Sequence, residues 1–149
     1  MSQLSPLLSA SSSSPEETIC MGRRAATLFQ QGKGLILLHG ELGAGKTTFI
    51  KGLISELCQV EEESIISPTF TYMNLYEGKQ RVIHFDLYRL SGLAAFLAQG
   101  FTDFLLEEAI VIIEWPDRIT SLLPPDYYEI HMDYTGASKR TISISRRIS

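Results

Sequence analysis

Residues 40–47 have the types and spacing of a phosphate-binding loop. They are Gly40-Glu41-Leu42-Gly43-Ala44-Gly45-Lys46-Thr47, which fits G-x-x-x-x-G-K-[ST] at every fixed position. Glycines let the backbone wrap around a polyphosphate with its N–H groups pointing inward. Lys46 would reach the β- and γ-phosphates, and the Thr47 hydroxyl would bind the accompanying Mg²⁺. The alternative is a glycine-rich turn that binds nothing, but such a turn does not require Lys and Thr directly after its last glycine.

The residues around this loop have the pattern of a strand before it and a helix after it. Leu35 to Leu38 form a short apolar run between two glycines, which is typical of a strand buried on both faces. After the loop, apolar residues recur at steps of three and four, the period of an amphipathic helix. A helix beginning there would also direct the positive end of its dipole at the phosphates. The periodic positions are Phe49, Ile50, Leu53, Ile54 and Leu57.

Two carboxylates follow apolar strand candidates and are the expected partners of the loop. Asp86 follows residues 82–85, and Glu114 follows residues 109–113, the most apolar strand candidate of the chain. Ligands of open α/β sheets collect at the carboxyl ends of strands, and phosphoryl transfer needs an acidic residue there for Mg²⁺. Asp86 is the first choice for the metal, and Glu114 would hold the same metal or orient the attacking water. Either carboxylate could instead be a turn residue at a strand end.

A hydroxyl-bearing segment, Ser67-Pro68-Thr69, lies between the loop helix and the Asp86 strand. Small GTP-binding switches place their γ-phosphate sensor in this interval, so Thr69 is a candidate catalytic residue with Ser67 behind it. A proline-containing strand start with surface hydroxyls is an equally good interpretation. His84 alternates with Asp86 along the chain, and we interpret it as an interior residue. Trp115 fits a core position and a cavity rim equally well.

Composition is that of an ordinary globular protein of one domain. Of the 149 residues, 44% are apolar and 20% are charged, which argues against disorder of the whole chain. No apolar run approaches the about 20 residues needed to cross a bilayer, and no secretory signal is recognisable. Cys20 and Cys58 are expected to be buried free thiols of a cytoplasmic protein. The net charge of −4 argues against broad binding of nucleic acid, so neither DNA nor a membrane is an expected partner.

The pattern as a whole predicts an α/β fold, a P-loop NTPase-like three-layer domain with a mixed central sheet. Residues 1–14 are serine-rich and are expected to form a flexible leader, and the domain is expected to cover residues 15–149. The N-cap signal Ser14-Pro15-Glu16-Glu17 predicts a helix to about Gln31. The other expected elements are a hairpin (residues 65–72 with 81–86), a helix (93–108) and strands (109–113, 127–133 and 141–145).

Four segments together resemble the TsaE family, the small ATPases of bacterial tRNA threonylcarbamoyladenosine synthesis. The resemblance covers roughly residues 15–145, and its His-Phe-Asp-Leu-Tyr-Arg string is far more specific than the phosphate-binding loop. At Ser91-Gly92-Leu93 the chain departs from the family, which usually has an acidic helix start there. The matching segments are the loop with Thr48, Ser67-Pro68-Thr69-Phe70-Thr71, His84-Phe85-Asp86-Leu87-Tyr88-Arg89-Leu90 and Glu114-Trp115-Pro116.

The resemblance implies an ATP-binding, Mg²⁺-dependent ATPase that works with two partners, TsaB and TsaD, and reaches tRNA through them. TsaD transfers a threonylcarbamoyl group to adenosine 37 of tRNA, and ATP hydrolysis by TsaE supports turnover. By position, Gly43 to Thr48 hold the phosphates and residues 67–69 form a switch-like segment. The residues implied to serve Mg²⁺ are Thr47, Asp86 and Glu114. The residues implied to lie near the nucleotide base are Glu17, Thr18 and Arg140.

Three other functions fit the loop when it is considered alone. A stand-alone small-molecule or nucleotide kinase is the main alternative, although such kinases usually carry an Arg-rich lid that is not visible here. A GTP-dependent switch is disfavoured because no Asp-x-x-Gly follows the metal strand and no Asn-Lys-x-Asp motif occurs. The third alternative is an adaptor that binds ATP without hydrolysing it.

Overall fold

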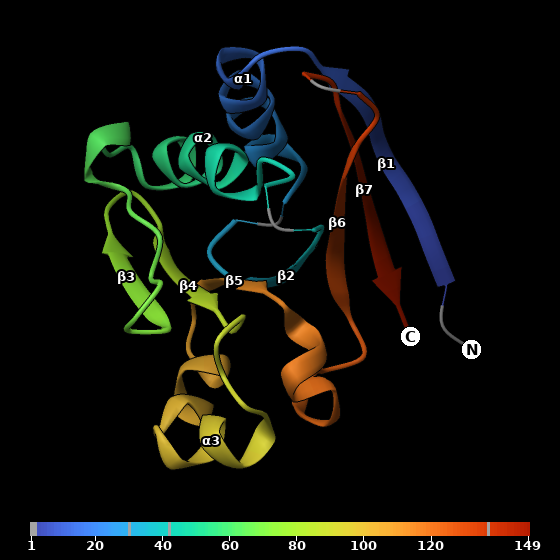
Figure 1. The fold of residues 1–149 in the computed structure, drawn as a ribbon. Coiled ribbons are helices and arrows are strands. Elements are labelled where there is room, and N and C mark those ends of the chain that lie inside the picture. The colour runs from blue at the N-terminus through green and yellow to red at the C-terminus, as the bar shows by residue number, and fades with distance from the viewer. Residues whose placement is uncertain (1–2, 30, 42, 137) are drawn as a thin grey trace.

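A mixed sheet between two layers of helix makes up the fold (Figure 1). The computed structural model describes residues 3–29, 31–41, 43–136 and 138–149. In this part of the chain, α1 (Pro15–Ala25) and α2 (Lys46–Cys58) cover one face of the sheet, and α3 (Leu93–Ala98) with short 3₁₀ turns covers the other. A cluster of buried apolar side chains fills the space on each side. This is the three-layer, P-loop NTPase-like α/β fold predicted from the sequence.

One sheet contains the seven strands found in the described residues. They are β1 (Gln3–Ser12), β2 (Gly34–His39), β3 (Met73–Glu77), β4 (Arg81–Asp86), β5 (Ile110–Glu114), β6 (Tyr127–Tyr134) and β7 (Arg140–Ile148). Their order across the sheet is β1-β7-β6-β2-β5-β4-β3. The four strands β6, β2, β5 and β4 are mutually parallel, so their carboxyl ends meet at one edge. This edge is where an open α/β sheet binds its ligands.

Two of the predicted helices end earlier than their periodicity indicates. The first ends at Ala25 and continues only as a 3₁₀ turn to Leu28. The second, predicted over residues 93–108, is interrupted at Gly100, whose φ of 75° lies in the left-handed region. Glycine adopts this conformation without steric cost, so it ends the α-helix and allows a separate 3₁₀ turn over Phe101–Leu106.

The hairpin of β3 and β4 forms, but its first strand begins later than predicted. β3 starts at Met73, and residues 69–72 form a turn in which Tyr72 has a φ of 66°. The Tyr72 N–H donates to the Pro68 carbonyl at 3.0 Å, which closes this turn. The proline therefore sets a turn before the strand rather than the beginning of the strand.

The two cysteines differ in burial, so the prediction for one of them is wrong. Cys58 is a buried free thiol, and burial raises its pKa to about 11. Cys20 is exposed because the face of α1 that packs on α2 carries Thr18, Gly22 and Ala25 instead. Helical periodicity places Cys20 away from that face.

The serine-rich segment forms a strand, so the predicted flexible leader is wrong for residues 3–12. β1 pairs antiparallel with β7 along its length, with one bulge between Pro6 and Leu8. Ser12 at its end is fully buried, and its hydroxyl is hydrogen-bonded to Thr18 Oγ1 at 2.8 Å. Serine is not among the residues enriched in strands, but the ladder is made by backbone groups that every residue except proline supplies in full. The segment therefore pairs with the edge of β7 although it is rich in serine.

Deleting residues 1–12 is expected to destabilise the protein and to expose β7. The melting temperature should fall by at least about 2–4 °C, the shift expected for each kcal/mol in a chain of this size. Amide hydrogens of residues 141–147 should exchange faster, because β7 becomes an unpaired edge. Hydrogen exchange measured by mass spectrometry tests this, with the buried strand β5 as internal control. Unchanged protection of β7 would mean that β1 is not paired with it in solution.

Helices α1 and α2 pack closely through a pair of glycines. A Cβ added to Gly22 would overlap the Phe49 carbonyl oxygen, and a Cβ added to Gly52 would overlap the Ile19 carbonyl oxygen. Both obstacles are backbone atoms, which cannot rotate away as a side chain can. The close approach of the helices fixes where α2, and therefore the loop at its N-terminus, lies above the sheet.

Replacing Gly52 by alanine is expected to cost about 1–3 kcal/mol of unfolding free energy, because the helices must move apart to admit the methyl group. Urea denaturation of the variant and of the unchanged chain measures the difference. Gly136→Ala is the matched control, since an added Cβ there meets nothing within 4 Å. Equal losses in the two variants would contradict the proposed close packing.

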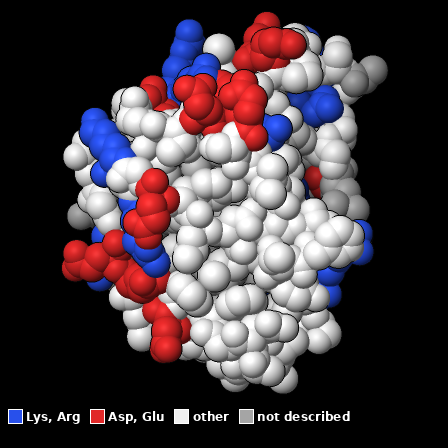
Figure 2. Space-filling view, turned by 90° about the vertical axis from the view of Figure 1, so that its left-hand side faces the viewer, with Lys and Arg blue, Asp and Glu red and all other residues white. Residues whose placement is uncertain are grey.

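No helix in the described part of the chain is long and apolar enough to cross a membrane. Figure 2 shows the side of the molecule near β3 and α3. Its charged side chains gather toward the top and along the two edges, most densely on the left, and a broad uncharged area lies between them.

Candidate functional site

The phosphate-binding loop connects β2 to α2 at the carboxyl edge of the sheet. Gly43 and Gly45 have φ values of 81° and 93°, a conformation that residues with a Cβ rarely adopt. A Cβ on Gly43 would also approach the Tyr134 hydroxyl at 2.9 Å. Helix α2 then begins at Lys46, with its unpaired N–H groups at the loop. This geometry is suited to holding an anion at the helix N-terminus.

The Lys46 ammonium lies inside the loop rather than in solvent. Only 6% of the residue is exposed, and Nζ donates to the Gly40 carbonyl at 2.6 Å. Nζ also lies 4.3 Å from the centre of the Trp115 ring, within cation–π range. Burial lowers the pKa of Lys46, and the carboxylates of Glu114, Asp86 and Glu41 oppose this shift. The cation is therefore held in place near two acidic groups.

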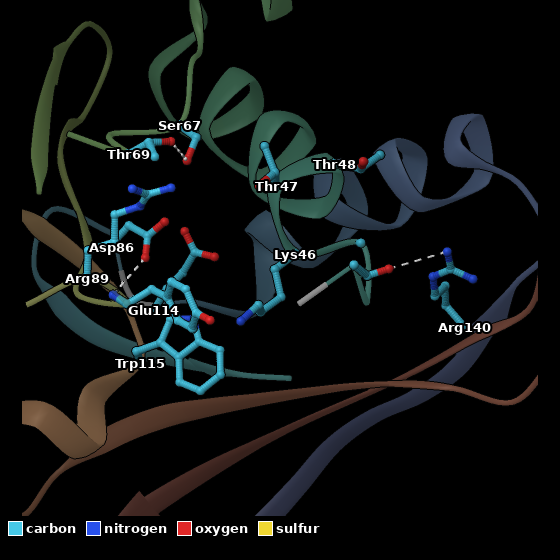
Figure 3. Close-up of a pocket in the computed structure, with 13 residues that line it drawn as sticks. Lys46, Thr47, Thr48, Ser67, Thr69, Asp86, Arg89, Glu114, Trp115 and Arg140 are labelled. Atoms are coloured by element: carbon cyan, nitrogen blue, oxygen red, sulfur yellow. Dashed lines mark hydrogen bonds between the residues drawn. The ribbon is translucent and has the colours of Figure 1, made fainter. Parts of the chain in front are cut away.

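Asp86 and Glu114 lie side by side at the ends of β4 and β5, where they are register partners. Glu114 is buried, and its Oε2 lies 2.9 Å from Nε2 of the buried His84. A carboxylate accepts, so the Nε2–H of His84 donates in this pair. Asp86 is half-buried and accepts a hydrogen bond from the Tyr88 N–H at 3.1 Å. Both carboxylates are thus held by neighbouring groups, as Figure 3 shows for Asp86.

Burial raises the pKa of Asp86, and the nearby Glu114 carboxylate raises it further. When folding raises the pKa of an acid, the neutral acid stabilises the folded state. This contribution is complete at a pH below the unfolded-state pKa, and it is lost as the pH rises through the folded-state pKa. At neutral pH the ionised Asp86 therefore costs stability. A carboxyl with a shifted pKa that also lines a cavity is a candidate for a binding or catalytic group.

Asp86→Asn is consequently expected to raise the melting temperature of the nucleotide-free protein at neutral pH. A gain of about 2–4 °C would correspond to about 1 kcal/mol in a chain of this size. The gain should shrink as the pH falls through the raised pKa of Asp86, because the carboxyl is then neutral in the unchanged chain too. Thermal unfolding across pH 4–8 measures this. Asp103→Asn, at an exposed acid, should show no comparable effect.

A single cavity of about 500 Å³ brings the loop, the two carboxylates and the 67–69 segment together. Its lining has cations and hydroxyls on several sides and the carboxylates at one end (Figure 3). The volume is in the range of pockets that hold a small ligand. The lining residues are Gly43, Gly45, Lys46, Thr47, Thr48, Ser67, Thr69, Asp86, Tyr88, Arg89, Glu114, Trp115 and Arg140.

Ser67 and Thr69 of the 67–69 segment both line the cavity. Thr69 Oγ1 donates to Ser67 Oγ over a long 3.4 Å. Phe70 beside them is 80% exposed, and the Arg89 guanidinium lies 5.2 Å from the centre of its ring. The segment therefore lies at the cavity, and the Tyr72 N–H, which donates to the Pro68 carbonyl, helps to hold it there.

The three residues implied to lie near the base do not all reach the same space. Thr18 and Arg140 line a second cavity of about 260 Å³, which shares Gly45 and Thr48 with the first. Arg140 also contacts the loop, with Nη2 3.5 Å from the Gly43 carbonyl oxygen (Figure 3). Glu17 lines neither cavity, because its carboxylate accepts from the Ser13 N–H at 2.8 Å and completes the cap of α1.

Two other residues of the loop, Ala44 and Glu41, have different positions relative to the cavity. Ala44 is buried and donates its N–H to the Glu41 carbonyl at 3.1 Å, which shapes the turn. The Glu41 side chain lines a different cavity, beside His39. Leu42 lies outside the described residues.

Several residues that contribute to the site have no clear signal in the sequence. The contact of His84 with Glu114 depends on the pairing of β4 with β5, which only the sheet order determines. Trp115 has a φ of 59°, and its ring lies against the Lys46 ammonium. Tyr134 stacks under the Arg140 guanidinium at 3.7 Å, and no motif marks it. His84 alternates with Asp86 along one strand, and both His84 and Trp115 lie in strings that carry the family resemblance, so signals for these two were present in the sequence.

The chain matches known proteins over most of its length. Residues 12–142 match the family described as "Threonylcarbamoyl adenosine biosynthesis protein TsaE". Two proteins named tRNA threonylcarbamoyladenosine biosynthesis protein TsaE cover 90% of this chain. The one from Treponema pallidum is 34% identical over 134 residues, 97% of its own length. The one from Aquifex aeolicus is 39% identical over 135 residues, 92% of its own length.

A solved structure has the same fold. The crystal structure of Bacillus subtilus YdiB superposes with a TM-score of 0.73 at 27% identity, and covers 97% of this chain and 86% of that one. The loop, the His84–Asp86 string and the Glu114 strand all lie inside the matched residues 12–142. The site geometry and these matches lead to one conclusion: the chain belongs to the TsaE family of threonylcarbamoyl adenosine biosynthesis proteins.

Proposed function

We propose that the protein is a Mg²⁺-dependent ATPase that acts in threonylcarbamoyl modification of adenosine 37 in tRNA. The observation that carries the proposal is the single cavity in which Lys46 and Thr47 face Asp86 and Glu114. Its position at the N-terminus of α2 suits the phosphates of a nucleotide. The adjoining cavity beside Thr18 and Arg140 would take the base and ribose.

The donors in the cavity fit Mg²⁺, which prefers oxygen ligands and usually keeps several waters. Thr47, Asp86 and Glu114 would hold the ion, and its charge would offset that of the phosphates during hydrolysis. Lys46 would bind the β- and γ-phosphates and move from the Gly40 carbonyl to do so. Glu114, oriented by His84, would position the attacking water or share the metal with Asp86. Thr69 would contact the γ-phosphate.

The proposed partners are TsaB and TsaD homologues, and tRNA would be reached only through them. The broad uncharged area in Figure 2 and highly exposed apolar side chains support a protein partner rather than direct tRNA binding. The most exposed of these side chains are Ile66 (65%), Phe70 (80%) and Leu106 (76%). Because bacterial tRNA is modified in the cytoplasm, the proposal includes a cytoplasmic location.

ATP hydrolysis by the chain alone and with purified TsaB and TsaD homologues tests this function. We expect low activity alone and clear stimulation by the two partners. ATP binding without hydrolysis under any condition would instead mean an adaptor. Phosphoryl transfer to offered nucleosides, nucleotides or small hydroxy acids would mean a kinase, and a calorimetric preference for GTP over ATP would mean a switch.

A further inference from the structure

A second cluster of chemically competent side chains lies beside the first residue of the loop. His39 ends β2 directly before Gly40, and His131 is its register partner on the neighbouring strand β6. Glu129 lies two residues before His131, so both side chains are on the same face of β6. The two imidazole rings stack with centres 4.5 Å apart and planes within 11°. None of these three residues lines the nucleotide cavity.

The distances in the cluster suit a bound ion better than a hydrogen bond. Glu129 Oε1 lies 3.6 Å from His39 Nε2, and Oε2 lies 3.8 Å from His131 Nε2, both too long for hydrogen bonds. One ligand atom from each residue lies within 4.8 Å of the others. A tetrahedral ion with bonds of about 2.0–2.1 Å holds its ligand atoms about 3.3–3.5 Å apart. Small side-chain rotations would therefore close the cluster around an ion.

The cluster also has a space in which to complete a coordination shell. His39 and His131 line a cavity of about 240 Å³, and the acids Asp117 and Asp133 line it too. Water or one of these carboxylates could be the fourth ligand. His39 Nε2 is buried without a hydrogen-bond partner among the described residues. Arg147 opposes the binding of a metal ion. Its Nη2 lies 3.9 Å from Glu129 Oε2 and would compete with the ion for that oxygen.

We propose that His39, Glu129 and His131 form a binding site for a divalent transition metal of the Zn²⁺ class, distinct from the Mg²⁺ site of the nucleotide. Two imidazoles and one carboxylate suit Zn²⁺ and its neighbours, whereas Mg²⁺ takes oxygen ligands. The bound ion would join the end of β2 to β6 where the phosphate-binding loop begins. Lys46 and Trp115 line both cavities, so this metal would lie behind the wall of the nucleotide site.

Titration of the nucleotide-free full chain with Zn²⁺ by calorimetry, and with Co²⁺ by absorption, tests the proposal. All variants carry Cys20→Ser, because that exposed thiol could bind these ions by itself. We expect one ion per chain and Co²⁺ bands typical of four-coordinate geometry. His131→Asn and Glu129→Gln should each weaken binding at least tenfold, since loss even of a group behind a ligand costs about 10–100-fold.

The third histidine of the chain supplies the matched control. His84→Asn removes an imidazole that contacts a carboxylate elsewhere and should leave the affinity for Zn²⁺ unchanged. His131 is exposed, so circular dichroism and the melting temperature of His131→Asn should match those of the parent. Three outcomes overturn the proposal: no binding by the parent chain, equal affinity in His131→Asn and the parent, or loss of binding only in His84→Asn. The first two would make the cluster a polar contact between strand ends.

Discussion

Lys46→Ala is expected to lower the rate of ATP hydrolysis by about 10²–10³-fold, the cost of removing one fixed donor from developing charge. The side chain is almost fully buried in the loop, and no other described cation takes its position against the Gly40 carbonyl. Water that enters in its place would screen the phosphates poorly. Initial rates at saturating ATP and Mg²⁺, with both partners present, measure the effect.

Lys51→Ala is the matched control for this change. Lys51 lies on the same helix and does not line the nucleotide cavity, so its loss should leave the rate within about twofold. Lys46→Met keeps most of the apolar part of the side chain without the ammonium group and should be as inactive as Lys46→Ala. Full stimulation by the partners in either Lys46 variant would show that hydrolysis occurs elsewhere. That result would reject the site but leave the family membership unaffected.

Glu114→Gln is expected to lower hydrolysis by about 10²-fold or more, while ATP binding is retained. Glutamine keeps the size of the side chain in a buried position and removes only its charge. Nucleotide binding should survive because the loop and Lys46 are unchanged. Single-turnover rates and ATP affinity, measured on the same preparation, separate the two effects. Loss of binding in parallel with the rate would mean that Glu114 serves the nucleotide rather than the chemistry.

The roles of the two carboxylates can be distinguished by their response to Mg²⁺. We expect Asp86→Asn to raise the Mg²⁺ concentration needed for half-maximal rate, and Glu114→Gln to lower the rate even at saturating Mg²⁺. His84→Asn should resemble a weaker form of Glu114→Gln, because it loosens the carboxylate without removing it. If the two variants showed the opposite responses, the metal would be assigned to Glu114 on β5 instead of Asp86 on β4.

Much of the site was predictable from the sequence because its parts are local. The loop motif depends on glycine conformations and on a Lys-Thr pair, all within eight consecutive residues. Asp86 and Glu114 were predictable because apolar runs indicate strands, and the carboxyl ends of parallel strands meet at one edge. The same local reasoning explains two errors. Serine content indicated a flexible leader where β7 provides an edge, and periodicity missed the break at Gly100.

Features that join distant segments could not be predicted in this way. His84 meets Glu114, and Glu129 and His131 lie near His39, only because of the order and register of the strands. Strand order depends on packing between segments far apart in the chain, which single-residue patterns do not encode.

The sequence by itself determined the phosphate-binding loop, the acidic strand ends and the family, because each depends on residue types at short, fixed spacing. The tertiary structure alone decided which side chains face one another. It joined His84 to Glu114, placed Trp115 over Lys46, separated Glu17 from the nucleotide cavity and paired β1 with β7. The physical reason is that pairwise contacts follow from strand register and close helix packing, and both are properties of the folded chain.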